Sequence, residues 1–266
     1  MSSVVFLFLA HLGIGIAVSL LLVSKEAGVK FFRFNAGLAA ALVAVALAFR
    51  PDPALTKHAV TSTASLTALG VALGCLTVYW IIAGRVLARL RPVLAIVAAV
   101  AGVVAAALHG FNAAAPSVSG ATLTALSAVA SVGLLGGACT AMVLGHWYLV
   151  LPSMHVLHLQ RVVVYHIVTL AFRLVLFALV LALAYDDPLL TGQTARRYIM
   201  SVDGIFFWQR VLFGLAAPAV LAILTWETAK IRSTQSATGI LYVDFFTVVV
   251  GEILAGYILL STGLAA

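Results

Sequence analysis

Residues 162–185 read VVVYHIVTLAFRLVLFALVLALAY, a predominantly apolar stretch in which Arg173 is the only charged residue. About 20 such residues in a helix cross the hydrocarbon core of a bilayer, so this stretch predicts a transmembrane helix. The same pattern recurs along the whole chain. Seven further candidate spans lie near 3–23, 34–50, 62–84, 92–110, 121–151, 205–227 and 237–263. The sequence therefore predicts an all-α polytopic membrane protein, a bundle of about eight transmembrane helices forming a single domain over 1–266.

The composition excludes several other classes of protein. Of the 266 residues 64% are hydrophobic and 9% are charged, whereas soluble domains have about 45–50% apolar and 25% charged residues. Cys75 and Cys139 both lie within apolar runs, which excludes a disulfide scaffold and a thiolate zinc site. Most basic residues lie in short loops between spans, so the net charge of +7 indicates topology and anionic lipid, and no nucleic acid partner is expected.

The basic residues are distributed unevenly between the two sides of the predicted bundle. The loops after spans one, three, five and seven carry nine of them: Lys25, Lys30, Arg33, Arg85, Arg89, Arg91, Arg161, Lys230 and Arg232. The other side carries Arg50, Lys57, Arg196 and Arg197, together with Asp52, Asp186, Asp187 and Asp203. Because cytoplasmic loops are enriched in Lys and Arg, we expect both termini outside, in a bacterial inner (cytoplasmic) membrane.

Four histidines lie inside the predicted spans, and their depths suggest two pairs. His11 and His109 are placed towards the outer face, and His146 and His166 towards the inner face, by the rise of 1.5 Å per residue. Each pair comes from two different helices. Two b-type haems stacked across a membrane, each with two axial histidines, would require this distribution. The sequence therefore predicts one or two non-covalent haem b groups with these four histidines as iron ligands. A histidine near a span end that bonds only protein or headgroups is the alternative.

Charged side chains also occur deep within the spans, at Arg173, Arg210, Asp244 and Glu252. Charges inside a bilayer are costly and normally face the bundle interior, where they are paired or functional. Asp244 and Glu252 lie eight residues apart on one helix and, with Arg173, are candidates for a proton path. The alternative is an ion pair between Arg173 and Glu252 that only fixes helix register.

Trp147 and Tyr148 follow His146 at the inner end of the fifth span. Aromatic residues at this depth usually form the interfacial belt of a membrane protein. Aromatic walls and hydrogen-bond donors next to a histidine also suit a quinone head group, so we expect a quinone pocket here if one exists.

Together these patterns favour one function over two alternatives. The arrangement is similar to that of the membrane-embedded b-type cytochrome and quinone-reacting subunits of bacterial respiratory complexes, although no sequence motif carries the similarity. We expect a subunit that passes electrons between the quinone pool and a partner redox subunit, and that acts as a quinone/quinol oxidoreductase only with its partners. A proton-coupled transporter and a cofactor-free accessory subunit are the alternatives.

Overall fold

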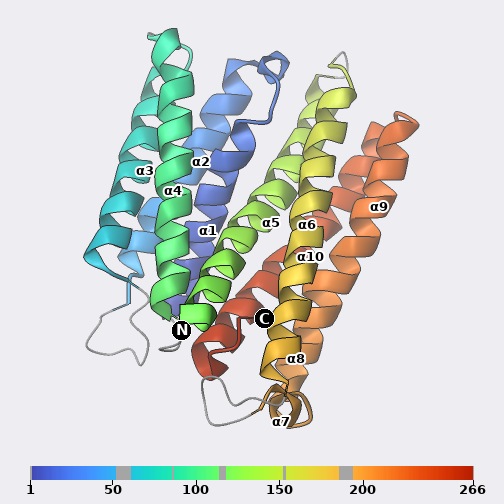
Figure 1. The fold of residues 1–266 in the computed structure, drawn as a ribbon. Coiled ribbons are helices and arrows are strands. Elements are labelled where there is room, and N and C mark those ends of the chain that lie inside the picture. The colour runs from blue at the N-terminus through green and yellow to red at the C-terminus, as the bar shows by residue number, and fades with distance from the viewer. Residues whose placement is uncertain are drawn as a thin grey trace.

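The computed structural model describes residues 2–51, 61–85, 87–113, 118–151, 154–185 and 194–265. Eight helices in these segments are long and apolar enough to cross a membrane, and no strand occurs in them (Figure 1). The helices are α1 (Ser2–Leu20), α2 (Gly28–Ala48), α3 (Thr63–Ile82), α4 (Arg91–Ala113), α5 (Val118–Val150), α6 (Leu157–Ala184), the composite Gly204–Lys230 and α10 (Thr234–Thr262). The all-α polytopic fold is confirmed, and the chain is a multi-pass membrane protein.

The seventh span is a composite of three elements rather than one regular helix. It consists of α8 (Gly204–Val211), a π-helical turn η3 (Leu212–Ala216) and α9 (Ala217–Lys230). Short π-helical turns occur mostly within α-helices and often at functional sites. The remaining elements are short: η1 (Lys25–Ala27), η2 (Ala88–Leu90) and α7 (Ala195–Ile199).

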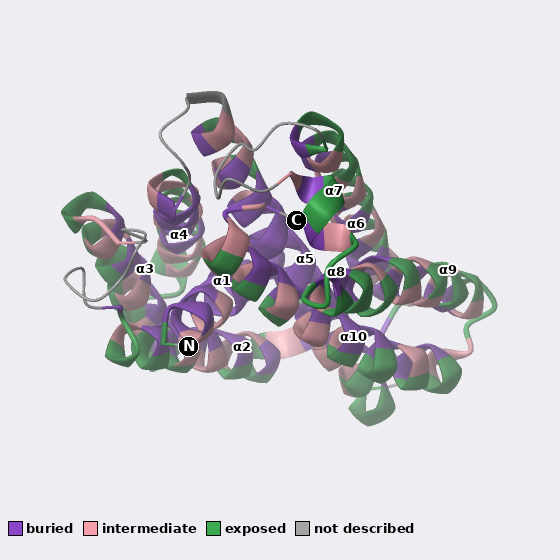
Figure 2. Ribbon diagram, turned by 90° about the horizontal axis from the view of Figure 1, so that it is seen from below, coloured by how far each residue is buried: buried purple, intermediate pink, exposed green. Residues whose placement is uncertain are grey.

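Helices α1 and α5 form the centre of the bundle. In an 18-residue apolar stretch of each span, 83% of the residues are buried in α5 and 72% in α1, whereas the share does not exceed 39% in any other span. Figure 2 shows the buried residues gathered on these inner helices and the exposed residues on the outward faces of the others. The outer helices therefore present apolar side chains to the surrounding lipid, and most polar groups in the middle of α5 and α1 are enclosed by protein.

Two helices begin earlier in the structure than the sequence predicted. The second helix starts at Gly28 rather than near 34, and the sixth starts at Leu157 rather than near 162. Both omitted stretches contain basic residues, Lys30 and Arg33 in one and Arg161 in the other. Long basic side chains extend from a helix end to the headgroup region, so a charge near the interface does not end a transmembrane helix.

Both termini lie at one end of the bundle, the lower end of Figure 1. We call this the termini end. The opposite end carries the nine basic residues of the loops after spans one, three, five and seven, and we call it the basic end. Of the residues used for the charge count, Asp52, Lys57, Asp186 and Asp187 lie outside the described residues.

Candidate functional site

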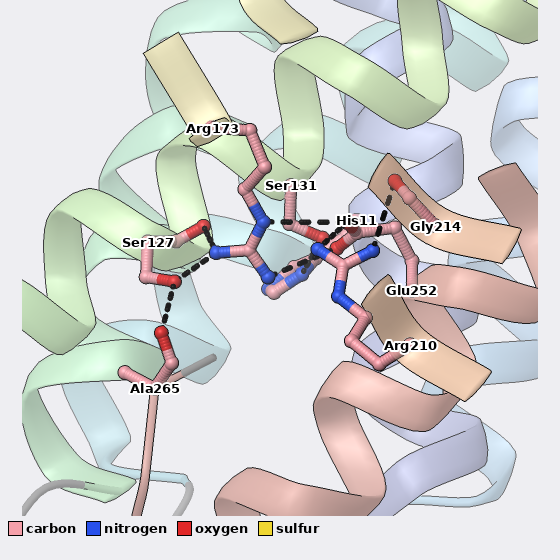
Figure 3. A network of polar contacts seen from close by, with 8 residues as sticks. All are labelled: His11, Ser127, Ser131, Arg173, Arg210, Gly214, Glu252 and Ala265. Carbon is pink, nitrogen blue, oxygen red and sulfur yellow. Dashed lines mark hydrogen bonds and ion pairs between the residues drawn. The ribbon is translucent and has the colours of Figure 1, made fainter. Parts of the chain in front are cut away.

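A cluster of three buried charges joins α6, α8 and α10 inside the bundle. Arg173 approaches the Glu252 carboxylate with Nε 3.3 Å from Oε1 and Nη2 3.4 Å from Oε2, and Arg210 donates from Nη2 to Oε1 at 2.8 Å (Figure 3). All three side chains are at most 5% exposed. The sequence had suggested the pair of Arg173 and Glu252, but not that Arg210 shares the same carboxylate. One carboxylate between two guanidinium groups leaves the cluster with one net positive charge.

The π-helical turn η3 brings Arg210 to this position. Arg210 Nη1 donates to the carbonyl oxygen of Gly214 at 3.2 Å, four residues further along the same span. Gly214 itself packs against Gly251 of α10, because a Cβ on Gly214 would lie 2.7 Å from the Gly251 Cα. Two glycines thus let the seventh span approach α10 closely enough for Arg210 to reach Glu252.

Two serine hydroxyl groups on α5 connect the charge cluster to other parts of the bundle. Arg173 Nη1 hydrogen-bonds both the carbonyl oxygen and the hydroxyl of Ser127, whose Oγ donates to the carbonyl of Ala265 at 3.2 Å. One turn further on, Ser131 Oγ lies 3.3 Å from His11 Nδ1 and interacts with the Glu252 carboxylate. Ser131 therefore joins the cluster to a histidine on α1.

The structure brings His11 and His109 together, as the depth argument predicted. Their ring centres are 6.4 Å apart and the ring planes differ by 26°. Both side chains are buried, at 6% and 0% exposure. Neither nitrogen of His109 nor Nε2 of His11 has a hydrogen-bond partner within the described part of the chain. Buried polar atoms are normally satisfied, so these three nitrogen atoms call for a ligand or an ordered water.

A small cavity connects these histidines with the charge cluster. Its volume is about 40 Å³, and its polar lining includes His11, His109, Ser127, Ser131, Arg173 and Glu252. Five helices contribute to it, and its remaining walls are mostly apolar. The cavity is large enough for water but not for a large organic group in this packing.

A second buried pair lies closer to the basic end. His166 Nε2 of α6 is 2.9 Å from Asp244 Oδ2 of α10, and the side chains are 1% and 0% exposed. Neither His166 Nδ1 nor Asp244 Oδ1 has a hydrogen-bond partner among the described residues. Asp244 and Glu252 are separated by eight residues of one helix, about 12 Å along its axis. Helices α6 and α10 therefore face each other with two contacts at different depths, each between a basic side chain of α6 and a carboxylate of α10.

The structure does not pair His146 with His166. His146 is on the exposed side of α5, where its Nδ1 lies 3.0 Å from the Tyr242 hydroxyl. The Cα of His166 instead lies opposite Gly137, 3.2 Å from where a Cβ on that glycine would be. Nine residues of α5 separate Gly137 from His146, about 13 Å along the axis. His146 and His166 were expected at the same depth from the sequence but lie at different depths in the structure, because α6 begins five residues earlier than the hydropathy indicated.

Trp147 and Tyr148 use their polar atoms to hold the backbone at the basic end. Trp147 Nε1 donates to the carbonyl of Ala27 at 2.9 Å, and its ring packs edge-on against Phe31. The Tyr148 hydroxyl donates to the carbonyl of His155 at 2.6 Å and accepts from the Leu159 amide at 3.3 Å. Both side chains therefore fix the contacts of α5 with neighbouring segments, and their hydrogen bonds are occupied without a quinone.

A comparison with known protein families found no matching family model, and a comparison with curated proteins found no match. The observations that bear on function are therefore the geometry of His11, His109 and the charge cluster.

Proposed function

We propose that the protein is an integral membrane subunit that passes electrons between quinone and a partner redox subunit, with one haem b held by His11 and His109. The observation that carries the proposal is this pair of buried imidazoles on α1 and α4, whose nitrogens largely lack partners. The spacing suits one iron. A ligating nitrogen lies about 2 Å from its metal and the ring centre about 1.1 Å further, so opposed imidazoles have centres about 6 Å apart.

A bare metal ion suits this site less well than haem iron. Structural ions bound by protein nitrogen and sulfur need about four ligands, and no group of three or more His, Cys, Asp or Glu in the described segments is arranged to hold one. A haem brings its porphyrin nitrogens with it, so the protein would need to supply only His11 and His109. A cavity of about 40 Å³ does not admit a porphyrin, so haem binding would require the side chains around the two imidazoles to move aside in the loaded protein.

When bound, the haem would supply one-electron transfer. The chain's own residues would handle protons and charge next to it. Ser131 contacts both His11 and Glu252, so these side chains form a short hydrogen-bonded route. Arg173 and Arg210 both contact the Glu252 carboxylate, and Arg173 and Glu252 line the adjoining cavity. Because the second histidine pair is not formed, we propose a single haem.

An absorption spectrum of the purified protein, oxidised and then reduced with dithionite, tests this proposal. We expect a Soret band and a reduced α band of b type. His11→Ala and His109→Ala should each abolish both bands, because a bis-histidine site loses its ligand set with either residue. The matched controls are His166→Ala, which removes another buried histidine, and His146→Ala, which removes an exposed one. Both should retain the spectrum. A wild-type protein purified from haem-sufficient cells without a Soret band would refute the proposal.

The second candidate function is proton-coupled transport, and one observation favours it. Asp244 and Glu252 lie at two depths of one helix, and each contacts a cationic or basic side chain of α6, His166 or Arg173. Carboxylates that exchange protons with either side of a membrane are typically arranged in this way inside a bundle. Proton uptake into proteoliposomes by a protein that lacks haem would support this function. If the protein neither binds haem nor takes up protons, a cofactor-free accessory subunit is the remaining function.

We also propose that the termini end faces outward and the basic end faces the cytoplasm, as expected from the nine basic residues in its loops. In a background without Cys75 and Cys139, Ser2→Cys and Val202→Cys should react with an impermeant thiol reagent in intact cells. Gln235→Cys, an exposed position at the basic end, should react only after permeabilisation. Labelling of Gln235→Cys alone in intact cells would reverse the orientation.

A further inference from the structure

A second cavity, much larger than the first, lies among α1, α2, α3 and α4 at the basic end. Its volume is about 620 Å³. That volume falls within the range of about 300–1,000 Å³ found for small-molecule sites. Its walls are mainly aliphatic and aromatic, with Leu20, Phe32, Leu76 and Tyr79 among them. We call it the basic-end cleft. It lies apart from the histidines and the charge cluster, with which it shares no lining residue.

The charged residues that line the cleft are all cationic. Three basic residues line it, Lys25 from η1, Arg89 from η2 and Arg91 from the start of α4, and no lining residue is acidic. None of the three forms an ion pair with a carboxylate of the described residues. Arg91 is half-buried, and its Nε is enclosed without a hydrogen-bond partner in this part of the chain. A guanidinium nitrogen held in this way needs an acceptor.

We propose that the basic-end cleft is a binding site for one anionic phospholipid of the leaflet at the basic end. The phosphate of this lipid lies among Lys25, Arg89 and Arg91, and its acyl chains enter the apolar space between α1 and α4. Charge decides this assignment over a quinone. A quinone is neutral and would leave three cations without a counterion, whereas a phosphate accepts several hydrogen bonds from guanidinium groups at once. Anionic lipids attract basic segments by about 1 kcal/mol per Lys or Arg at the membrane surface.

Native mass spectrometry of the delipidated, detergent-solubilised protein tests the proposal. The probes are dioleoyl phosphatidylglycerol and dioleoyl phosphatidylcholine, which share acyl chains and differ in net charge. We expect one phosphatidylglycerol to bind more tightly than phosphatidylcholine. Arg89→Gln and Arg91→Gln should each weaken phosphatidylglycerol binding about five-fold, and the double variant about 25-fold. Phosphatidylcholine binding should not change.

Matched variants separate this site from general surface charge. Arg85→Gln removes a basic residue of the same loop that does not line the cleft, and it should leave phosphatidylglycerol binding unchanged. Ala95→Phe should weaken binding by filling the apolar wall, whereas Val100→Phe, on a lipid-facing position of the same helix, should not. The Ala95→Phe result stands by itself if an arginine variant does not fold.

Three results would overturn the inference. The first is equal loss of phosphatidylglycerol binding in Arg85→Gln and Arg91→Gln. The second is displacement of the lipid by millimolar inorganic phosphate, which would indicate a site for the free ion. The third is displacement by equimolar decylubiquinone together with unchanged binding in the arginine variants, which would make the cleft a quinone site. None of these measurements depends on the haem proposal, so the two can fail separately.

Discussion

Glu252→Gln is expected to lower the free energy of unfolding by about 3–5 kcal/mol, the range found when one partner of a buried ion pair is removed. The reason lies in the stoichiometry of the charge cluster. Glu252 is the shared counterion of Arg173 and Arg210, and its side chain is 2% exposed. Glutamine keeps the shape of the side chain but not its charge, so two guanidinium groups remain buried without an anion. Unfolding in mixed micelles with increasing dodecyl sulfate measures the change.

Glu227→Gln is the matched control for this prediction. Glu227 also pairs with a cation, with its carboxylate 2.8 Å from Lys230 Nζ, but the two side chains are 59% and 47% exposed. Exposed pairs contribute about 0–1 kcal/mol, so this variant should unfold almost as the wild type does. Equal stability of Glu227→Gln and Glu252→Gln would contradict this prediction and show that the charge cluster is hydrated.

Double variants test whether three residues, rather than two, form the cluster. If only Arg173 and Glu252 interacted, replacing both by glutamine would restore most of the stability. Because Arg210 shares the carboxylate, the double variant Arg173→Gln and Glu252→Gln still contains one buried arginine without an anionic partner. It should therefore remain clearly less stable than the wild type. Arg210→Gln alone should be the mildest change, since it leaves the pair of Arg173 and Glu252 intact.

The eight spans could be predicted from the sequence because the bilayer imposes a simple physical requirement. In hydrocarbon every backbone amide and carbonyl must be paired within the segment, so a long apolar stretch forms a helix whatever its neighbours are. This requirement does not fix the residue at which each helix begins or ends. The π-helical turn at Leu212–Ala216 has no hydropathy signal, because it depends on the packing of Gly214 against Gly251.

The candidate site was only partly predictable, and helix register explains the difference. Depth alone brought His11 and His109 together because the predicted starts of the first and fourth spans differ by only one residue from those of α1 and α4. For His146 and His166 the same reasoning failed, because the start of α6 was misplaced and the hairpin of α5 and α6 is therefore shifted. Depth also gives no information on direction around a helix. His146 faces outward and His166 faces inward, and no one-dimensional count distinguishes them.

Small residues of α5 allow close packing with several neighbouring helices. Gly133 and Gly137 lie against Thr169, Tyr165 and His166 of α6, and Gly145 lies against Thr238 and Leu241 of α10. The tightest contact of an α5 glycine is made by Gly136. Gly136 packs directly on Gly15 of α1, so that the two backbones touch without intervening side chains. This contact fixes the spacing of the two central helices.

Gly136→Ala is accordingly expected to destabilise the protein by about 1–3 kcal/mol or more, the cost of inserting atoms into a well-packed core. A Cβ on Gly136 would meet the backbone of Gly15, 2.5 Å from its Cα, and backbone cannot rotate away as a side chain can. Gly70→Ala and Gly74→Ala are the controls. Nothing lies within 4 Å of a Cβ at either position, so each should be neutral or stabilise α3 by up to about 1 kcal/mol.

This substitution also links the packing of the bundle to the histidine site. His11 lies four residues before Gly15, on the same face of α1, and its Nδ1 contacts Ser131 of α5 at 3.3 Å. Moving α1 away from α5 would lengthen that contact and shift His11 relative to His109. Gly136→Ala should therefore reduce b-type absorption per protein, while Gly70→Ala leaves it unchanged. Full absorption in a destabilised Gly136→Ala variant would show that the position of His11 does not depend on the contact between the two central helices.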